Sequence, residues 1–333
     1  MCSSDLTTTA LSAAAAAKAY TEPGPFGVGV VTRTLPKGNK AEIWYPTPAS
    51  TKGTETYDVR DFVGPEIKKL LTGDAPATIT YPSTRDAAAA DGQFPVVLFS
   101  HGFSGMRLQS TFLTTHLASW GMIVVAPDHP SRDLFHLLGT PPKQDSVEDL
   151  QAALDVVIAE NTTSTSPLSG HVDAAKVAAV GHSAGGGSVV GAARSIASVQ
   201  GYVSMASGVF ADRNAAATPT TTAPPLPAKP SMFIAGANDQ IAVVKTVTRP
   251  AFAAAPTPTR LWLIDKAGHN AFDDFCRVGN GAGIIGVAEA SGLGPLLSNP
   301  PMSGIKRLGE DGCKPPNAPV TDVYPIRSEE HTV

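Results

Sequence analysis

The stretch KVAAVGHSAGGG at residues 176–187 decides the fold, because it runs from an apolar segment through a glycine-flanked serine into small residues. KVAAVG at residues 176–181 is typical of a β-strand buried on both faces. The small residues after Ser183 are typical of the first turn of a helix. Gly181 and Gly185 complete the pattern G-x-S-x-G, which presents a serine on a sharp strand-to-helix turn. The motif alone is a weak signal, and its place between strand and helix favours a nucleophilic serine over an ordinary turn.

The same alternation of apolar strand and helix extends in both directions from this stretch. Further strands are predicted at residues 95–100, 122–126, 199–205, 231–235 and 261–264. Helices are predicted at residues 110–119 and 185–197, near residues 65–71, and from Ser146 with Asp149 as its capping-box acid. Residues 28–31 and 41–45 are predicted to form an antiparallel hairpin. Apolar strands that alternate with helices require a mostly parallel sheet covered on both faces, so the predicted fold class is α/β.

Composition and charge exclude several classes of protein. Of the 333 residues, 42% are hydrophobic and 16% are charged, so the chain can bury a core and does not belong to the disordered class. Its net charge of −4 offers no basic surface for nucleic acid. No uninterrupted run of about 18 apolar residues is present, so no membrane span is predicted. The length fits one large domain, and no internal repeat is apparent.

The two ends of the chain are set apart from the predicted domain. Residues 1–6 and 327–333 resemble the translated ends of a sequencing-library adapter, so we expect a gene truncated at one or both ends. The alanine-rich residues 7–27 include LSAAAAAKA, which is similar to the last part of a signal peptide but lacks its charged start. We therefore expect a single domain at residues 28–326, a monomer, and export to the periplasm or the cell exterior.

Two cysteines, Cys276 and Cys313, remain once Cys2 is set aside with the adapter-like residues. They show no C-x-x-C spacing, so no metal site is predicted from them. Either they form a disulfide, which fits an oxidising compartment, or they are two buried free thiols. The disulfide is the favoured interpretation.

A serine hydroxyl needs a base to attack at neutral pH, and in this fold class the base follows the nucleophile in the chain. His269, in AGHN just beyond the last predicted strand, is the best placed of eight histidines. The imidazole in turn needs an anionic partner. Asp239 follows the strand at residues 231–235 and satisfies the order serine, aspartate, histidine. Asp212 and Asp128 are the competing carboxylates, and Asp128 is more typical of a structural turn because it precedes the nucleophile.

The oxygen that becomes negative during acyl transfer needs two backbone N–H donors. The residue after the nucleophile, Ala184, is expected to supply one. The second is expected from Phe103 in HGFSG at residues 101–105, which follows a predicted strand. The competing interpretation of this segment is a flexible turn without a role in catalysis.

Between residues 28 and 326 the sequence resembles the α/β-hydrolases, in particular bacterial platelet-activating-factor-acetylhydrolase-like esterases and the cutinase or polyester-hydrolase branch. The motifs that carry the resemblance are EIWYP (42–46), FSHGFSGMRLQS (99–110), LASWGMIVVAPDH (117–129), GHSAGGG (181–187), GANDQIA (236–242) and AGHNAFDDFC (267–276). In the acetylhydrolases proper the acid usually follows the preceding strand, where this chain has MASG at residues 205–208 with no carboxylate. The placement of Asp239 is therefore similar to that of the cutinase branch.

The resemblance implies hydrolysis of short- to medium-chain carboxylic esters, with a small-molecule or a polymeric ester as substrate and without a cofactor or a metal. The segment between residues 205 and 231 is short and proline-rich, which predicts an open cleft with no large lid domain. Phe103, His182 and Ile241 are expected to contact the substrate. Two alternatives stay open: acyl transfer or amide hydrolysis by the same residues, and a binding protein without catalysis on the same fold.

Overall fold

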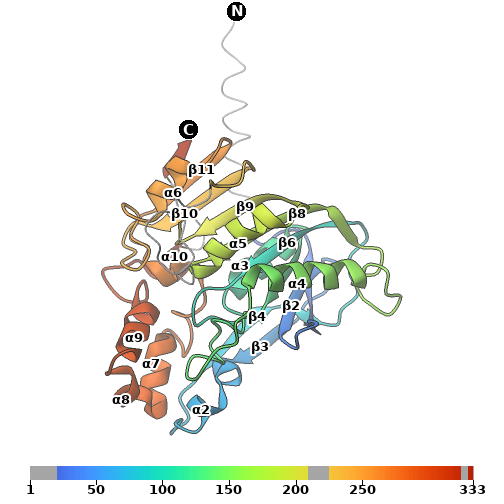
Figure 1. The fold of residues 1–333 in the computed structure, drawn as a ribbon. Helices are drawn as coiled ribbons and strands as arrows, with labels where there is room; N and C mark the ends of the chain where they lie inside the picture. Colours follow the sequence, from blue (N-terminus) through green and yellow to red (C-terminus); the bar gives the residue numbers. More distant parts are fainter. Residues whose placement is uncertain (1–20, 209–224, 324–328, 333) are drawn as a thin grey trace, which may run out of the picture.

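The computed structural model describes residues 21–208, 225–323 and 329–332, and its main feature is a large twisted sheet (Figure 1). The order of the strands across the sheet is β12-β11-β10-β9-β8-β6-β7-β2-β1-β5. These strands are β1 (Gly27–Thr34), β2 (Lys40–Thr47), β5 (Thr84–Arg85), β6 (Phe94–Ser100), β7 (Ile123–Pro127), β8 (Val172–His182), β9 (Val199–Met205), β10 (Ser231–Gly236), β11 (Thr259–Ile264) and β12 (Glu329–Thr332).

The central strands from β7 to β11 run parallel to one another, and the β1–β2 hairpin is antiparallel. All five residues of β7 are buried, because both faces of the sheet are covered and only an apolar strand fits there. The α/β class, the mostly parallel sheet and the hairpin are therefore confirmed. The strand predicted at residues 176–181 is longer than expected and begins at Val172.

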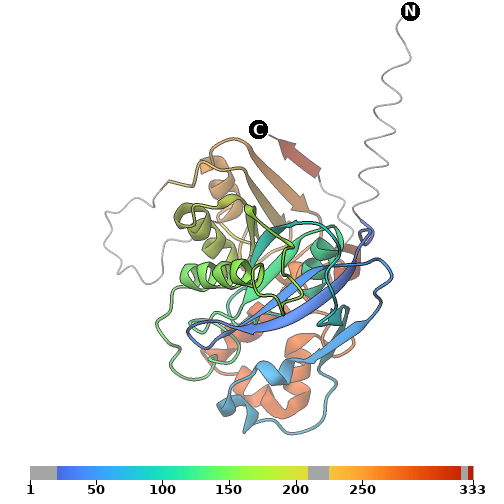
Figure 2. The same cartoon turned by 90° about the vertical axis from the view of Figure 1, so that its right-hand side faces the viewer.

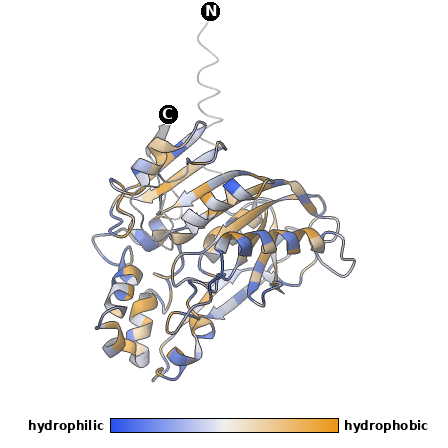
Figure 3. Ribbon diagram, in the orientation of Figure 1, coloured by the Kyte–Doolittle hydropathy of each residue, from blue (hydrophilic) through white to orange (hydrophobic). Residues whose placement is uncertain are grey.

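Helices on the two faces bury separate hydrophobic clusters. One cluster includes Leu150 and Leu154 of α4 with Val189 of α5, and the other includes Ala118 of α3 on the opposite face. Helices α4 and α5 cross the near face of the sheet in Figure 1, and Figure 3 shows that α4 alternates hydrophobic and hydrophilic residues. The helices that cover the sheet are α3 (Thr111–Ser119), α4 (Ser146–Glu160), α5 (Ala184–Ser195) and α6 (Thr248–Ala254).

The predicted cap of α4 is wrong. The N-cap is Asp145, whose side chain accepts a hydrogen bond from the N–H of Val147. Asp149 is buried and its carboxylate contacts His129 instead. A carboxylate in the first turn suits a helix N-terminus in either position, so sequence spacing alone does not separate the two.

The segment between β2 and β6 forms a small second layer. It contains the two-stranded sheet of β3 (Thr54–Asp58) and β4 (Thr78–Pro82), the 3-10 helix η1 (Val59–Phe62) and the short helix α2 (Pro65–Lys68). The helix predicted near residues 65–71 is thus confirmed, and Pro65 starts it because a proline is tolerated in the first turn.

The chain after β11 forms several short helices, of which α7 (Gly283–Ala288), α8 (Gly294–Leu297) and α9 (Met302–Glu310) lie at the same end of the molecule as α2 (Figures 1 and 2). None of these helices was predicted, and the segment is interrupted by Gly and Pro. Its elements are η2 (His269–Phe272), α7 (Gly283–Ala288), the π-helical η3 (Glu289–Leu293), α8 (Gly294–Leu297), α9 (Met302–Glu310) and α10 (Val320–Val323). A disulfide joins Cys276 to Cys313, which confirms the favoured pairing.

None of the helices described is long and apolar enough to cross a membrane. The predictions for residues 1–20 and 324–328, and for Asp212, lie outside the described residues. At the carboxyl end, β12 (Glu329–Thr332) pairs antiparallel with β11.

Candidate active site

Ser183 stands on the turn between β8 and α5 with φ of 55°, a backbone conformation that residues other than glycine rarely adopt. The flanking glycines make this turn possible. A Cβ on Gly185 would lie 2.0 Å from the carbonyl oxygen of Ser100, and one on Gly181 would lie 2.3 Å from the carbonyl oxygen of Gly185. The N–H of Ser183 donates to Met205 at 2.8 Å, which fixes the turn against β9. The motif therefore holds the serine in a strained and defined position.

His269 and Asp239 form a hydrogen-bonded chain with Ser183. Nε2 of His269 lies 2.9 Å from Oγ of Ser183, and Nδ1 lies 2.9 Å from Oδ2 of Asp239. The other oxygen of Asp239 accepts from the N–H groups of Ile241 and Ala242 at 2.8 and 2.7 Å. Burial disfavours the charged Asp239, but the hydrogen bonds from His269 and these backbone groups outweigh it and hold its pKa below the ordinary value. The structure thus brings the three predicted side chains together.

The competing carboxylate Asp128 is engaged elsewhere. It accepts hydrogen bonds from the backbone N–H and the guanidinium of Arg107 at 2.8 and 2.7 Å. Its ion pair fixes the segment after β6 to the end of β7, which agrees with the structural role expected for it.

The loop after β6 packs directly against Ser183. A Cβ on Gly102 would lie 3.2 Å from Cβ of Ser183, so this position needs a glycine or a small shift of the loop. Within the described part of the chain, the N–H groups of Phe103 and Ala184 have no acceptor. Both are the donors expected for the oxyanion, and that role stays a prediction.

Gln109 connects three parts of the site and was not predicted as a site residue. Its Oε1 accepts from the N–H of Gly102 at 2.7 Å, and its Nε2 lies 3.0 Å from the buried carboxyl of Asp273 and 2.9 Å from Nδ1 of His182. Burial raises the pKa of Asp273 well above its ordinary value. No spacing rule relates residues 109 and 273, so only the folded chain reveals this contact.

His182 supports His269, the expected base. Burial and then the neighbouring His269 lower its pKa to about 3, so its ring is neutral at physiological pH. Its Nε2 lies 2.9 Å from the carbonyl oxygen of His269, and because a carbonyl only accepts, this nitrogen carries the proton. The ring therefore fixes the backbone of the loop that carries His269.

Asp311 is a second residue that the sequence did not reveal. Its two carboxylate oxygens accept from the N–H of His269 at 2.8 Å and from the N–H of Gln240 at 2.9 Å. This side chain therefore connects the loop that carries His269 to the loop that carries Asp239. Burial raises its pKa above the ordinary value.

A second serine–histidine–aspartate chain lies in the interior at the end of β6. Nε2 of His129 is 2.8 Å from Oγ of Ser100, and Nδ1 is 3.0 Å from Oδ2 of Asp149. The guanidinium of Arg132 donates to the same Ser100 oxygen at 2.9 Å and to the carbonyl oxygen of His101 at 2.8 Å. We call these four side chains, Ser100, His129, Asp149 and Arg132, the inner array.

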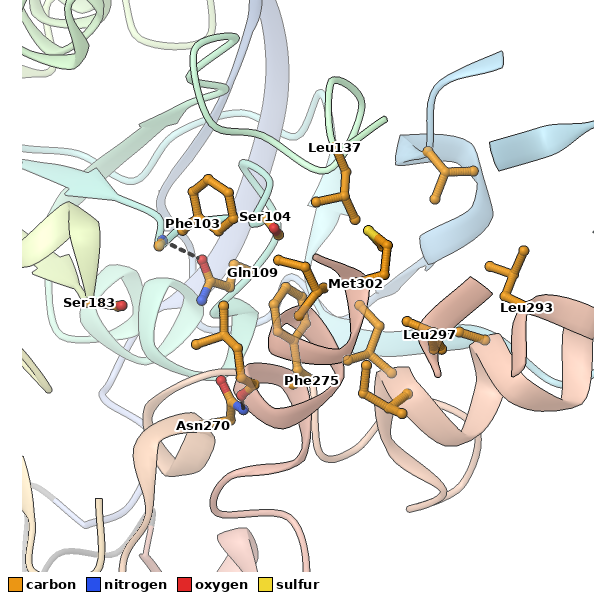
Figure 4. Close-up of a pocket in the computed structure, with 18 of the residues that line it drawn as sticks. Phe103, Ser104, Gln109, Leu137, Ser183, Asn270, Phe275, Leu293, Leu297 and Met302 are labelled. Atoms are coloured by element: carbon orange, nitrogen blue, oxygen red, sulfur yellow. Dashed lines mark hydrogen bonds between the residues drawn. The ribbon is translucent and has the colours of Figure 1, made fainter. Parts of the chain in front are cut away.

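A cavity of about 740 Å³, its open mouth included, begins at Ser183 and His269. Phe103 and His182 line it as predicted, whereas Ile241 does not and instead donates its N–H to Asp239. Figure 4 shows the lining side chains extending from Ser183 towards Leu293 on the helices after β11. Among the residues described, no group of three His, Cys, Asp or Glu side chains is arranged to hold a metal ion.

A mostly parallel sheet with a serine on the turn after a central strand defines an α/β-hydrolase. The chain belongs to the PETase family, described as PET hydrolase-like, whose model matches residues 45–284. It is also similar to a bis(hydroxyethyl) terephthalate hydrolase of Streptomyces coelicolor, with 27% identity over 191 residues. That alignment covers 57% of this chain and 53% of the relative, so the chain spans about half the length of this curated relative. The expected resemblance to polyester hydrolases is confirmed at the level of the family.

Proposed function

We propose that this protein is a serine carboxylic ester hydrolase that acts through Ser183, His269 and Asp239. The observation that carries the proposal is the continuous hydrogen-bonded chain from Asp239 to Ser183, with Ser183 at one end of the cavity. Membership of the PET hydrolase-like family and the similarity to a hydrolase of terephthalate esters support it.

In the acylation step, Nε2 of His269 takes the proton of the Ser183 hydroxyl while Oγ attacks the ester carbonyl carbon. The N–H groups of Phe103 and Ala184 hold the negative oxygen of the tetrahedral intermediate. His269 then gives the proton to the departing alcohol, which leaves an acyl group on Ser183. Asp239 stabilises the transient imidazolium, and its own position is fixed by the N–H groups of Ile241 and Ala242.

In the deacylation step, water replaces the alcohol and repeats the sequence. His269 removes a proton from the water, which attacks the acyl carbon, and the proton returns to Oγ of Ser183 as the acid is released. This chemistry uses no cofactor and no metal. The substrates we propose are short- to medium-chain esters, with polyesters as a further candidate.

The test combines turnover and labelling. We expect the purified protein to hydrolyse p-nitrophenyl butyrate and to react with a fluorophosphonate probe, because only an activated serine does so. Ser183→Ala should lose both. Labelling of another residue, or turnover that survives in Ser183→Ala, contradicts the assignment. Product analysis with added alcohol separates hydrolysis from acyl transfer, and a p-nitroanilide substrate tests amide hydrolysis.

We also propose an exported, monomeric protein with one domain at residues 28–326. The Cys276–Cys313 disulfide supports export, since such bonds persist in oxidising compartments. The assignment of residues 1–6 and 327–333 to an adapter stays a prediction, and the DNA of the original clone tests it.

A further inference from the structure

The disulfide joins the two ends of a segment that begins and ends beside the proposed active site. Cys276 and Cys313 are 37 positions apart in sequence, but their Cα atoms are 4.9 Å apart. Residues 277–312 therefore form a closed excursion, which we call the bridged segment, and it contains α7, η3, α8 and α9. The match to the family model ends at residue 284, so most of the bridged segment lies beyond it.

The bridged segment is anchored to the loop that carries the proposed base. At its end, Asp311 accepts from the N–H of His269, and its carbonyl oxygen accepts from the N–H of Asn270 at 2.9 Å. The side chain of Asn270 donates to the carbonyl oxygen of Leu308 at 2.7 Å. A Cβ on Gly268 would lie 2.5 Å from Cα of Gly312, so the two backbones touch. The segment is thus positioned by the same loop as His269.

Its far side is anchored to the segment after β3. The N–H of Thr72 donates to the carbonyl oxygen of Ser291 at 2.8 Å. Val63 and Ile67, on either side of the start of α2, line the cavity opposite the bridged segment. The helices of the bridged segment therefore lie between the loop of His269 and the segment after β3, and Figures 1 and 2 show them beside α2.

The side of the bridged segment that faces the cavity consists of apolar side chains. Each of its helices contributes, through Ile284, Ala288, Leu293, Leu297, Met302 and Ile305. Lys306 and Glu289 do not line the cavity and pair with each other instead. Beyond Asn270 the lining residues carry no polar side chain, so this part of the cavity offers no partner for a charged or hydroxylated group (Figure 4). Leu, Ile and Met side chains line it together with Val63 and Phe275, and the flexible aliphatic side chains among them suit an aliphatic chain.

We propose that the bridged segment is a cap that binds the aliphatic chain of the ester and makes medium-chain aliphatic esters the preferred substrates. This deepens the proposed function and rests on it, because the carbonyl group would sit at Ser183, at one end of the cavity. The chain lies between the bridged segment and α2. Its source is either the acyl or the alcohol part of the ester, and both have the same chemistry.

Two homologous series of esters test the proposal. One varies the acyl chain from acetate to dodecanoate with p-nitrophenol as the alcohol, and the other varies the alkyl alcohol of an acetate. In one series we expect kcat/KM to rise about fourfold for each added CH₂ until the cavity is full. The series that shows the rise identifies which part of the ester occupies the cap. A flat profile in both series, or a preference for benzoates over aliphatic esters of equal carbon number, overturns the proposal.

A matched pair of variants localises the effect. Ala288 lines the cavity, whereas Ala290, two residues on, is exposed and does not. Ala288→Phe fills the space for the chain, so the ratio of octanoate to acetate turnover should fall at least tenfold. Ala290→Phe should keep the wild-type ratio. Equal ratios in the two variants contradict the proposal, provided that melting temperatures show both to be folded.

A binding measurement keeps the proposal testable without turnover. In a Ser183→Ala background, methyl ketones of rising chain length are titrated by calorimetry, since they resemble esters and are not hydrolysed. We expect Kd to fall with chain length, and Ala288→Phe in the same background to remove this dependence. Chain-length-independent binding overturns the cap. If instead binding follows chain length but no ester is hydrolysed, the proposed function fails and the cap stands.

Discussion

The structure holds two hydrogen-bonded series of serine, histidine and aspartate, with nearly the same geometry and opposite surroundings. We call the series at the cavity the outer chain and the series in the inner array the inner chain. In the outer chain, Ser183, His269 and Asp239 are joined by two contacts of 2.9 Å, and in the inner array the corresponding distances are 2.8 and 3.0 Å. Ser183 lines the cavity, whereas Ser100 is fully buried. Distances alone therefore do not distinguish a reactive serine from a structural one.

Charge and access separate the two chains. In the inner array, burial and then the cation of Arg132 hold the pKa of His129 well below its ordinary value, so the ring resists the charge that a general base must accept. Arg132 also donates to Oγ of Ser100 and occupies the oxygen that would attack. In the outer chain the oxygen of Ser183 faces the cavity. Access to the serine oxygen, which the inner array lacks, is therefore what a reactive triad needs in addition to its hydrogen bonds.

The largest expected difference is in the loss of kcat when each of the two serines is substituted. Ser183→Ala should lower kcat by about five to six orders of magnitude, because the nucleophile is removed. Ser100→Ala should lower it by less than about tenfold, because only a supporting hydrogen bond is lost. Initial rates with p-nitrophenyl butyrate measure both. A loss of many orders of magnitude in Ser100→Ala, with the protein still folded, would reverse the assignment.

The second-largest difference is expected between substitutions of the two aspartates. Asp239→Asn should lower kcat by about four orders of magnitude, because an amide favours the wrong histidine tautomer. Asp149→Asn should instead lower the melting temperature and change kcat by less than about tenfold. Thermal unfolding and turnover on the same samples compare the two. Equal losses of kcat would mean that both chains take part in catalysis.

Arg132 should show how the inner array supports the outer one. Its guanidinium holds the carbonyl oxygen of His101, at the start of the loop expected to bind the oxyanion. Arg132→Met should lower kcat by about tenfold to a hundredfold while KM changes little, because a misplaced loop weakens transition-state binding. The control is Arg33→Met, which breaks the ion pair with Glu160 away from the site. A change in KM alone would indicate a role in substrate binding.

The smallest effect is on the pH dependence of stability. As the pH falls through 6.5, the unfolded chain binds a proton at His129 while the folded protein, with its lowered pKa, does not. The stability contributed by this residue is therefore lost as the pH falls. His129→Gln should make the free energy of unfolding decline less steeply between pH 7 and 5, by up to about 1.4 kcal/mol per pH unit.

Denaturant titrations at stepped pH measure these slopes. The buried carboxyl of Asp149, whose pKa is raised by burial, acts in the opposite direction in both proteins, so only the difference between them is informative. Coincident slopes would show that His129 is not held neutral in the folded protein.

Local sequence was sufficient to predict a site residue wherever one short stretch determines both the backbone structure and the residue at that position. The strand, the glycines and the serine at residues 176–187 specify the turn together, because its strain is tolerated only with Gly181 and Gly185 in place. His269 and Asp239 were found in the same way, since each follows an apolar strand and parallel strands end at the same edge of a sheet. The disulfide was favoured from two cysteines without a metal-binding spacing.

The supporting residues and the cap required the tertiary structure. Gln109, Asp311 and the inner array join positions far apart in the chain, and polar residues at such distances have no periodicity to reveal them. Residues 277–312 form a wall of the cavity because the disulfide and Asp311 hold this segment against the loop of His269. The sequence by itself was sufficient to predict the groups that we propose carry the chemistry, because backbone sterics act locally. Only folding decided which serine is accessible and what surrounds it, because burial and charge depend on neighbours from the whole chain.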